Sequence, residues 1–178
     1  MRERCRGASK PIAMRILMVC TANVCRSPMA EAALKHLVLQ SGEQLDVFSR
    51  GLITPGRTTV HEWAVKACLK SGVQIDQNRQ AVRLSLSNVH SSDLILVMEQ
   101  AHRSALRRDF PAYTGKVHML GRWQGVEIDD PLGGDEEQFA RCLCTIRRGV
   151  AAWMEHFREY QRARTASSWG AAMSRRTT

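Results

Sequence analysis

The sequence predicts an α/β fold, a three-layer sandwich in which helices flank a small parallel sheet. Short apolar runs of strand length alternate along the chain with longer segments of helical periodicity. The 178 residues are enough for one domain with a core of its own. Neither an internal repeat nor an interdomain linker interrupts the alternation, so we expect a single folded domain.

The first half of the chain contains two predicted strands and two predicted helices. Residues 12–20 form an apolar run suited to a buried parallel strand. A helix is expected over 29–39, with Ser27 as its N-cap, Pro28 at its start and Ser41-Gly42 at its end. The later elements are a strand at 45–49, a loop at 51–59 and a helix at 60–69.

The second half continues the alternation. We expect a short helical piece at 85–89, strands at 93–98 and 116–120, and a helix at 100–108 between them. The last helix is the best defined, because its apolar residues advance by three or four positions and so share one face. These residues are Phe139, Leu143, Ile146, Val150, Trp153 and Phe157.

The net charge of +9 lies mostly at the two ends of the chain. Residues 1–13 carry +3 and residues 161–178 carry +4, and neither segment has apolar periodicity. We therefore expect two disordered basic tails around a folded domain at 14–160. The domain itself carries only +2, so no nucleic-acid groove is indicated.

Other compositional features favour a cytoplasmic protein without membrane insertion. No run approaches the roughly 18 apolar residues of a membrane span, and Arg15 interrupts the stretch that could form a secretory signal. Most of the six cysteines should then be reduced. Cys68, Cys142 and Cys144 lie in helical patterns and are expected to be buried. No Cys/His spacing suggests zinc, so we expect no metal and no other cofactor. The oligomeric state does not follow from the sequence.

Residues 20–28, Cys-Thr-Ala-Asn-Val-Cys-Arg-Ser-Pro, follow directly on the first predicted strand. Ligands bind at the carboxyl ends of parallel strands. Backbone amides of this loop, the positive end of the next helix and Arg26 would favour the thiolate form of Cys20. The planar guanidinium can hold two phosphoryl oxygens. Ser27 can donate to the sulfur, and Asn23 tolerates a left-handed turn. The loop thus predicts attack on phosphorus by Cys20.

Such an attack leaves a cysteinyl-phosphate, and the departing oxygen needs a proton. We expect Asp130 to supply it, because Pro131 disfavours helix at Asp130 and Gly133-Gly134 lets the loop bend. In the second step the same carboxylate would accept a proton from the attacking water. Spacing alone leaves Asp129 as a competing choice.

These features resemble the low-molecular-weight protein tyrosine phosphatases of bacterial type over roughly residues 14–160. The resemblance rests on Ser49 and on three motifs: CTANVCRSPMAEA at 20–32, DLILVMEQAH at 93–102 and DDPLGG at 129–134. It implies a four-stranded parallel sheet and metal-free hydrolysis of phosphotyrosine in protein substrates. Relatives with this style of loop often act on a tyrosine autokinase of exopolysaccharide or capsule assembly, which makes such a kinase a candidate substrate.

The resemblance also implies a role for each site residue. It makes Cys20 the nucleophile, Arg26 the phosphate clamp, Ser27 the partner of the thiolate and Asp130, rather than Asp129, the general acid. The remaining positions form or support the loop; they are Thr21, Ala22, Asn23, Val24, Cys25 and Ser49. Of these, Asn23 and Ser49 match a supporting hydrogen-bond network, and Cys25 matches a cysteine that can trap Cys20 in a reversible disulfide.

The chain departs from the family pattern at several positions near the loop. Ala22 stands where the family usually has glycine, which implies some backbone adjustment. Gln80 stands where a histidine often supports the loop. Leu132 replaces an aromatic residue that flanks the substrate ring in many members. Arg50 stands where a small residue is common, so that Arg50 or Arg57 is expected near the pocket rim.

Three alternatives to a tyrosine phosphatase remain open at this point. A thioredoxin-coupled arsenate reductase needs relay cysteines near the third strand, and residues 76–98 contain none; its loop also commonly has glutamine in place of Pro28. Protein-arginine phosphatases have a polar threonine before the second loop cysteine, whereas Val24 favours an aryl phosphate. A non-catalytic phosphate-binding module does not require the complete set of nucleophile, clamp and acid.

Overall fold

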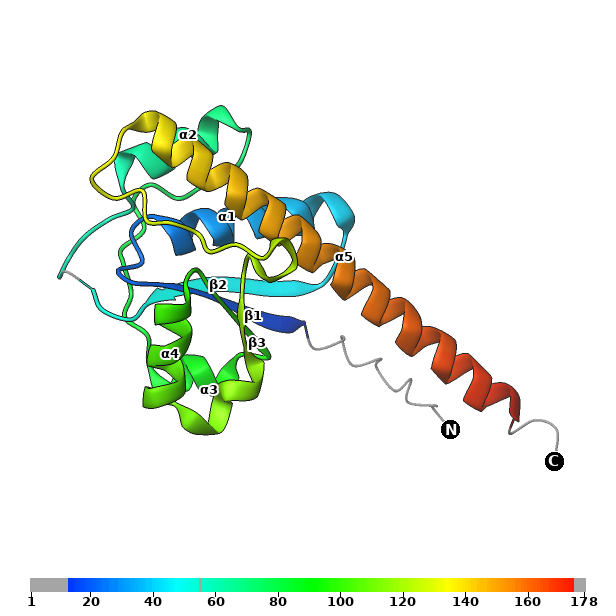
Figure 1. Ribbon diagram of the computed structural model, residues 1–178. Coiled ribbons are helices and arrows are strands. Elements are labelled where there is room, and N and C mark those ends of the chain that lie inside the picture. The colour runs from blue at the N-terminus through cyan, green and yellow to red at the C-terminus, as the bar shows by residue number, and fades with distance from the viewer. Residues whose placement is uncertain (1–12, 55, 175–178) are drawn as a thin grey trace, which may run out of the picture.

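The computed structural model describes residues 13–54 and 56–174. It shows a four-stranded parallel sheet in the order β2-β1-β3-β4 with helices on both faces (Figure 1), which confirms the predicted fold class. The strands are β1 (Met14–Cys20), β2 (Leu45–Gly51), β3 (Leu94–Val97) and β4 (Val117–Met119). Because β1 pairs with both β2 and β3, its last residue, Cys20, lies in the middle of the carboxyl edge of the sheet.

Two layers of helices cover the sheet. One contains α1 (Arg26–Ser41), α2 (Glu62–Lys70) and α5 (Glu136–Ser174); the other contains α3 (Leu86–Ser91) and α4 (Gln100–Asp109). Two 3-10 helices, η1 (Pro111–Lys116) and η2 (Arg122–Gln124), flank β4. Side chains of β1 alternate between the layers: Ile16 and Met18 pack in the cluster with α1, α2 and α5, and Leu17 and Val19 in the cluster with α3 and α4.

The start of α1 differs from the prediction. The helix begins at Arg26 with Cys25 at the N-cap position, and no side chain caps it. Ser27 was predicted as the N-cap, and this was wrong because its hydroxyl lies 3.0 Å from the Cys20 sulfur. The Ser27 side chain therefore contacts Cys20 in the loop and does not cap the helix.

The apolar stripe of α5 is confirmed as core packing, with every stripe residue no more than 8% exposed. Asp135 and Gln138 cap this helix by exchanging two hydrogen bonds between side chain and backbone. Cys144, expected to be buried, is exposed, because two positions along a helix from the buried Cys142 is nearly the opposite face.

The backbone of α5 is helical through Ser174. The sequence led us to expect a disordered tail from residue 161 onward, whereas the helix runs on over 161–174, where alanine, arginine and methionine favour continuation of a helix that is already formed. The expected N-terminal tail at 1–13 and residues 175–178 lie, apart from residue 13, outside the described part of the chain. In that part, no helix is long and apolar enough to cross a bilayer.

Candidate active site

The loop after Cys20 turns through residues 21–25 and leads into α1. Asn23 has a φ of 58°, and among the described residues no other non-glycine residue has a positive φ. The left-handed turn that the sequence predicted at Asn23 is thus confirmed. Ala22 is outside the region of φ that favours glycine, so alanine is accommodated there without the expected strain.

The end of β2 packs directly against the loop. A Cβ on Gly51 would lie 2.7 Å from the carbonyl carbon of Ala22 and 2.9 Å from the nitrogen of Asn23, which leaves room only for glycine. The following residue, Leu52, donates its N–H to the Cys20 carbonyl at 3.0 Å. Ile53 donates to the Thr21 carbonyl at 2.9 Å. The start of the loop is therefore fixed by the segment after β2.

Two donors surround the sulfur of the buried Cys20. The backbone N–H of Asn23 donates to it at 3.3 Å, and the Ser27 hydroxyl lies 3.0 Å away. Ser27 Oγ accepts a hydrogen bond from Asn23 Nδ2 at 2.9 Å, and its own proton can go to the sulfur at 3.0 Å or to the Arg50 carbonyl at 3.4 Å. Both contacts stabilise a negative charge on sulfur, as expected for a nucleophile that must also be a leaving group.

Asn23 makes all four hydrogen bonds that its side chain allows. Besides Ser27, Nδ2 donates to Ser49 Oγ at 2.8 Å, and Oδ1 accepts from Val82 N at 3.0 Å and from Arg79 Nη2 at 3.2 Å. The predicted pairing of Asn23 with Ser49 is therefore present. A fully bonded amide holds the strained turn in a single conformation.

Arg79 is a supporting residue that the sequence reasoning missed. Its Nη2 also donates to Ser49 at 3.0 Å to the carbonyl and 2.9 Å to Oγ, and its Nη1 pairs with Glu31 at 2.6 Å. The expectation pointed to the neighbouring Gln80, but Arg79 supplies the support. A single arginine in a polar stretch does not indicate a supporting role, because the residues near it in the sequence do not reveal its hydrogen-bond partners.

Arg26 is 2% exposed and is held on several sides. Nη1 pairs with Glu99 and donates to the Ile128 carbonyl at 3.0 Å. Nη2 donates to Thr21 Oγ1 at 3.3 Å and to Asp130 Oδ2 at 2.5 Å. Within the described residues Nε has no acceptor. The Nε hydrogen is therefore free for a phosphoryl oxygen, and a second contact would require the Nη2 hydrogen on Asp130 to turn to the phosphoryl group.

The structure brings Asp130 rather than Asp129 to the clamp. Asp130 Oδ2 contacts Arg26, its Oδ1 accepts from Leu132 N at 3.2 Å, and its side chain is 39% exposed. Asp129 offers its backbone carbonyl to the Cys142 thiol at 3.7 Å. Of the two aspartates, Asp130 is thus the one that lies next to Arg26, which is the position that the resemblance implies for the acid.

Cys25 and Val24 are both buried in the loop. Burial, assisted by the nearby Asp130 and Cys20, raises the pKa of Cys25 to about 12, although Arg26 acts in the opposite direction. Cys25 is therefore a neutral thiol at physiological pH. A neutral thiol is a weak nucleophile, so Cys25 is not poised to attack phosphorus itself.

Arg50 is not at the pocket rim, contrary to expectation. Its Nε donates to Asn88 in α3 at 3.2 Å and its Nη1 to the Ser49 carbonyl at 2.7 Å. The guanidinium lies over the Phe48 ring, 5.1 Å from its centroid. Arg57, the other candidate for the rim, is exposed.

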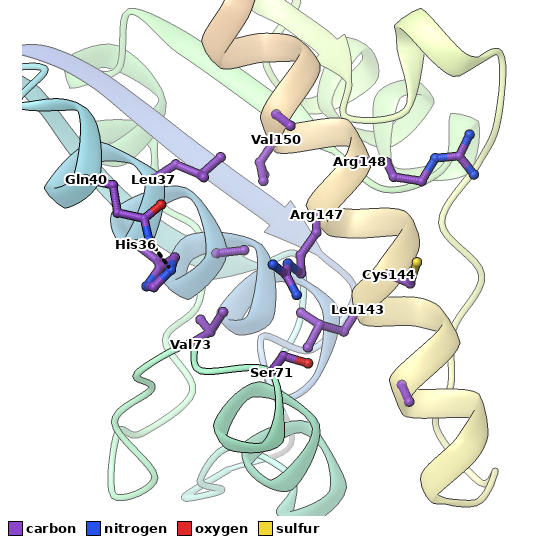
Figure 2. Close-up of a pocket in the computed structure, with 13 residues that line it drawn as sticks. His36, Leu37, Gln40, Ser71, Val73, Leu143, Cys144, Arg147, Arg148 and Val150 are labelled. Atoms are coloured by element: carbon purple, nitrogen blue, oxygen red, sulfur yellow. Dashed lines mark hydrogen bonds between the residues drawn. The ribbon is translucent and has the colours of Figure 1, made fainter.

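A cavity of about 450 Å³ lies elsewhere, between α1 and α5. Figure 2 shows Arg147 of α5 pointing toward α1, where His36 and Gln40 are joined by a 3.0 Å hydrogen bond. No residue of the loop at 20–28 lines this cavity, so it is separate from the candidate active site. In the described part of the chain, no group of three or more His, Cys, Asp or Glu side chains could hold a metal ion.

Comparisons with known proteins agree with this site. Residues 15–163 match the family described as low molecular weight phosphotyrosine protein phosphatase. A Ralstonia solanacearum protein, the probable low molecular weight protein-tyrosine-phosphatase EpsP, is 36% identical over 143 residues, which cover 80% of this chain and 95% of that protein. The protein-arginine-phosphatase of Bacillus subtilis (strain 168) is 33% identical over 126 residues, covering 68% and 81%.

A solved structure of a similar protein supports the same family. Vibrio vulnificus Wzb in complex with benzylphosphonate is 30% identical, with a TM-score of 0.75, and the match covers 81% of this chain and 99% of that one. The family match at 15–163 contains the loop at 20–28, Arg26 and Asp130. The chain belongs to the low molecular weight protein-tyrosine-phosphatase family.

Proposed function

We propose that this protein hydrolyses phosphotyrosine in protein substrates through a cysteinyl-phosphate on Cys20. One observation carries the proposal: Arg26 contacts both the loop that holds the nucleophile and the carboxylate of Asp130. Clamp, nucleophile and acid thus surround one position at the carboxyl edge of the sheet. Electrostatic stabilisation of a transferred phosphoryl group needs this arrangement.

The reaction runs in two displacements at phosphorus. The Cys20 sulfur forms a bond to phosphorus while the bond to the tyrosine oxygen breaks, and Asp130 gives that oxygen its proton. A water then attacks phosphorus as the phosphorus–sulfur bond breaks. Asp130 takes the proton of this water, and Ser27 stabilises the departing thiolate. Inorganic phosphate leaves, and the enzyme returns to its first state.

Two exposed apolar side chains support an aryl phosphate as substrate. Ile53 is 58% exposed and donates its backbone N–H to the Thr21 carbonyl; Leu132 is 55% exposed and donates its backbone N–H to Asp130 Oδ1. They are positioned on the two segments that border the nucleophile and the acid. We propose that they contact the tyrosine ring, in place of the aromatic residue that many family members have after Asp-Pro.

A panel of substrates tests the proposal. We expect turnover of phosphotyrosine peptides with a kcat/KM at least about a hundredfold above that for phosphoarginine peptides, because an apolar rim and the aliphatic Val24 favour an aromatic ring. Arsenate reduction coupled to thioredoxin should be absent. Preference for phosphoarginine would instead assign the activity of the Bacillus subtilis relative, and thioredoxin-dependent arsenate reduction would assign a reductase.

We further propose a tyrosine autokinase of exopolysaccharide or capsule assembly as the physiological substrate. The support is the resemblance of the loop to relatives of that kind and the similarity to EpsP. An autophosphorylated kinase of this class should be dephosphorylated with a higher kcat/KM than unrelated phosphotyrosine peptides of equal concentration. Equal values for both would remove the argument for this substrate.

Hydrogen peroxide should inactivate the enzyme reversibly. It oxidises the Cys20 thiolate to a sulfenic acid, and Cys25 then displaces water to form a disulfide that dithiothreitol reduces. Because the pKa of Cys25 is about 12, its thiolate fraction, and with it the rate of the disulfide step, should rise about tenfold per pH unit between pH 7 and 9. Acid quenching followed by peptide mass spectrometry measures this rate.

The matched variants for the peroxide experiment are Cys25→Ser and Cys144→Ser. Cys25→Ser should still be inactivated but should not recover with dithiothreitol, because Cys20 proceeds to sulfinic acid. Cys144→Ser should behave as wild type, since this thiol is exposed on α5. Full recovery of Cys25→Ser would show that Cys25 does not protect the nucleophile.

A further inference from the structure

His102 belongs to the motif at 93–102 but has no part in the two displacements described above. It is 3% exposed and lies in the first turn of α4. Its Nδ1 accepts the backbone N–H of Glu99 at 3.2 Å, and its Nε2 lies 2.9 Å from Thr21 Oγ1. Both partners also contact Arg26, Glu99 through its carboxylate and Thr21 through its hydroxyl oxygen. The four residues form a closed circuit of contacts.

The partners of His102 fix its tautomer. A backbone N–H can only donate, so Nδ1 must carry a lone pair toward Glu99. In the neutral ring the proton is then on Nε2, which donates to Thr21 Oγ1. Burial, with a further contribution from Arg26, lowers the pKa of His102 to about 4, although Asp130 acts in the opposite direction. The ring is therefore neutral throughout the physiological range.

The His102 ring holds Thr21 in place and, through Thr21, also restrains Arg26. Thr21 Oγ1 accepts from His102 Nε2 and from Arg26 Nη2, which occupies both of its lone pairs. With Glu99 and the Ile128 carbonyl on Nη1, every hydrogen of the guanidinium that does not face the phosphoryl position has a fixed acceptor. Together with these acceptors, the position of Thr21 Oγ1 therefore sets the direction of the Nε hydrogen and of the Nη2 hydrogen that contacts Asp130.

We propose that His102 is a positioning residue, which as a neutral Nε2–H donor holds Thr21 and thereby aims Arg26 at the phosphoryl group. This inference rests on the proposed phosphatase activity, but the circuit predicts phosphate binding and a tautomer that can be measured without turnover. Misplacement of a clamp by less than an ångström weakens transition-state stabilisation more than it weakens folding.

Two conservative substitutions separate the two contacts of the ring. In His102→Asn the amide oxygen takes the place of Nδ1 and keeps the contact to Glu99, but nothing reaches Thr21. In His102→Gln the amide nitrogen takes the place of Nε2 and keeps the donor to Thr21, but the contact to Glu99 is lost. If His102 only stabilised the start of α4, His102→Asn, which keeps the contact to Glu99, would retain more activity than His102→Gln.

We expect His102→Asn to keep the melting temperature of wild type and to lower kcat for p-nitrophenyl phosphate by about tenfold or more. Its dissociation constant for inorganic phosphate, measured by calorimetry, should rise by a similar factor. His102→Gln should melt at a lower temperature while its kcat and phosphate affinity stay within about twofold of wild type. His36→Asn, on the distant face of α1, is the control for loss of a histidine and should change neither quantity.

Thr21→Val and imidazole NMR complete the test. Because Thr21→Val removes the oxygen through which His102 acts, the double variant with His102→Asn should lose no more activity than the worse single variant. Nitrogen-15 spectra should show a neutral ring protonated at Nε2 at pH 5.5. Additive losses, a charged ring at that pH, or parallel losses of activity and stability in both His102 variants would overturn the proposal.

If wild type itself failed to hydrolyse aryl phosphates, the proposed function would be wrong. The phosphate affinities and the tautomer would then still decide the role of His102, because neither measurement depends on turnover.

Discussion

Replacing Cys20 with serine is expected to abolish turnover of p-nitrophenyl phosphate, with kcat reduced by about 10⁵-fold or more. A serine hydroxyl is not ionised at neutral pH, and among the described residues no base lies within hydrogen-bond distance of this position to activate it; the neighbours there are Ser27 and the Asn23 amide. The measurement is steady-state hydrolysis at saturating substrate, with phosphate binding as evidence that the loop is intact.

The loop should survive the change, since a serine oxygen can accept from the same two donors. Inorganic phosphate is therefore expected to bind the Cys20→Ser variant with an affinity within about tenfold of wild type. Cys144→Ser, an exposed cysteine replaced in the same way, should retain full activity. Substantial turnover by Cys20→Ser would exclude a cysteinyl-phosphate mechanism.

The second large effect is expected for Asp130→Asn. Loss of the proton donor should lower kcat for phosphotyrosine by 10²- to 10³-fold, the usual contribution of a general acid. The loss should be smaller for p-nitrophenyl phosphate, because p-nitrophenolate leaves readily without a proton. Asparagine has one accepting oxygen, so it keeps the contact to Arg26 or the contact to Leu132 but not both. The loop should still fold, because the side chain at this position is 39% exposed.

Asp129→Asn is the matched control, one residue away on the same loop. We expect its kcat to stay within about threefold of wild type, because of these two aspartates the one that contacts Arg26 is Asp130. The ratio of activities on the two substrates distinguishes a proton donor from a binding residue. If Asp129→Asn showed the larger loss and the stronger dependence on leaving group, the assignment of the acid would have to be reversed.

The amino-acid sequence by itself determined the parts of this protein that depend on neighbours along the chain. The nucleophile, the arginine and the left-handed Asn23 lie within seven consecutive residues between a strand and a helix, so the chain itself keeps them close together. The same holds for the α5 stripe, because helical periodicity is a local property. Asp130 was found because an Asp-Pro sequence marks a loop, although spacing alone could not separate it from Asp129.

Only the tertiary structure decided how the loop is supported. Arg79 bonds to Asn23 across 56 positions, and Glu99 bonds to Arg26 across 73. His102 reaches Thr21 across 81. Ser27 was misread as a helix cap because its position fits that role, whereas the sulfur that takes its hydroxyl is seven residues away. The physical reason is common to all of them: hydrogen-bond partners are selected when the sheet and helices pack, and the residue types involved occur at many surface positions where they make no such contact.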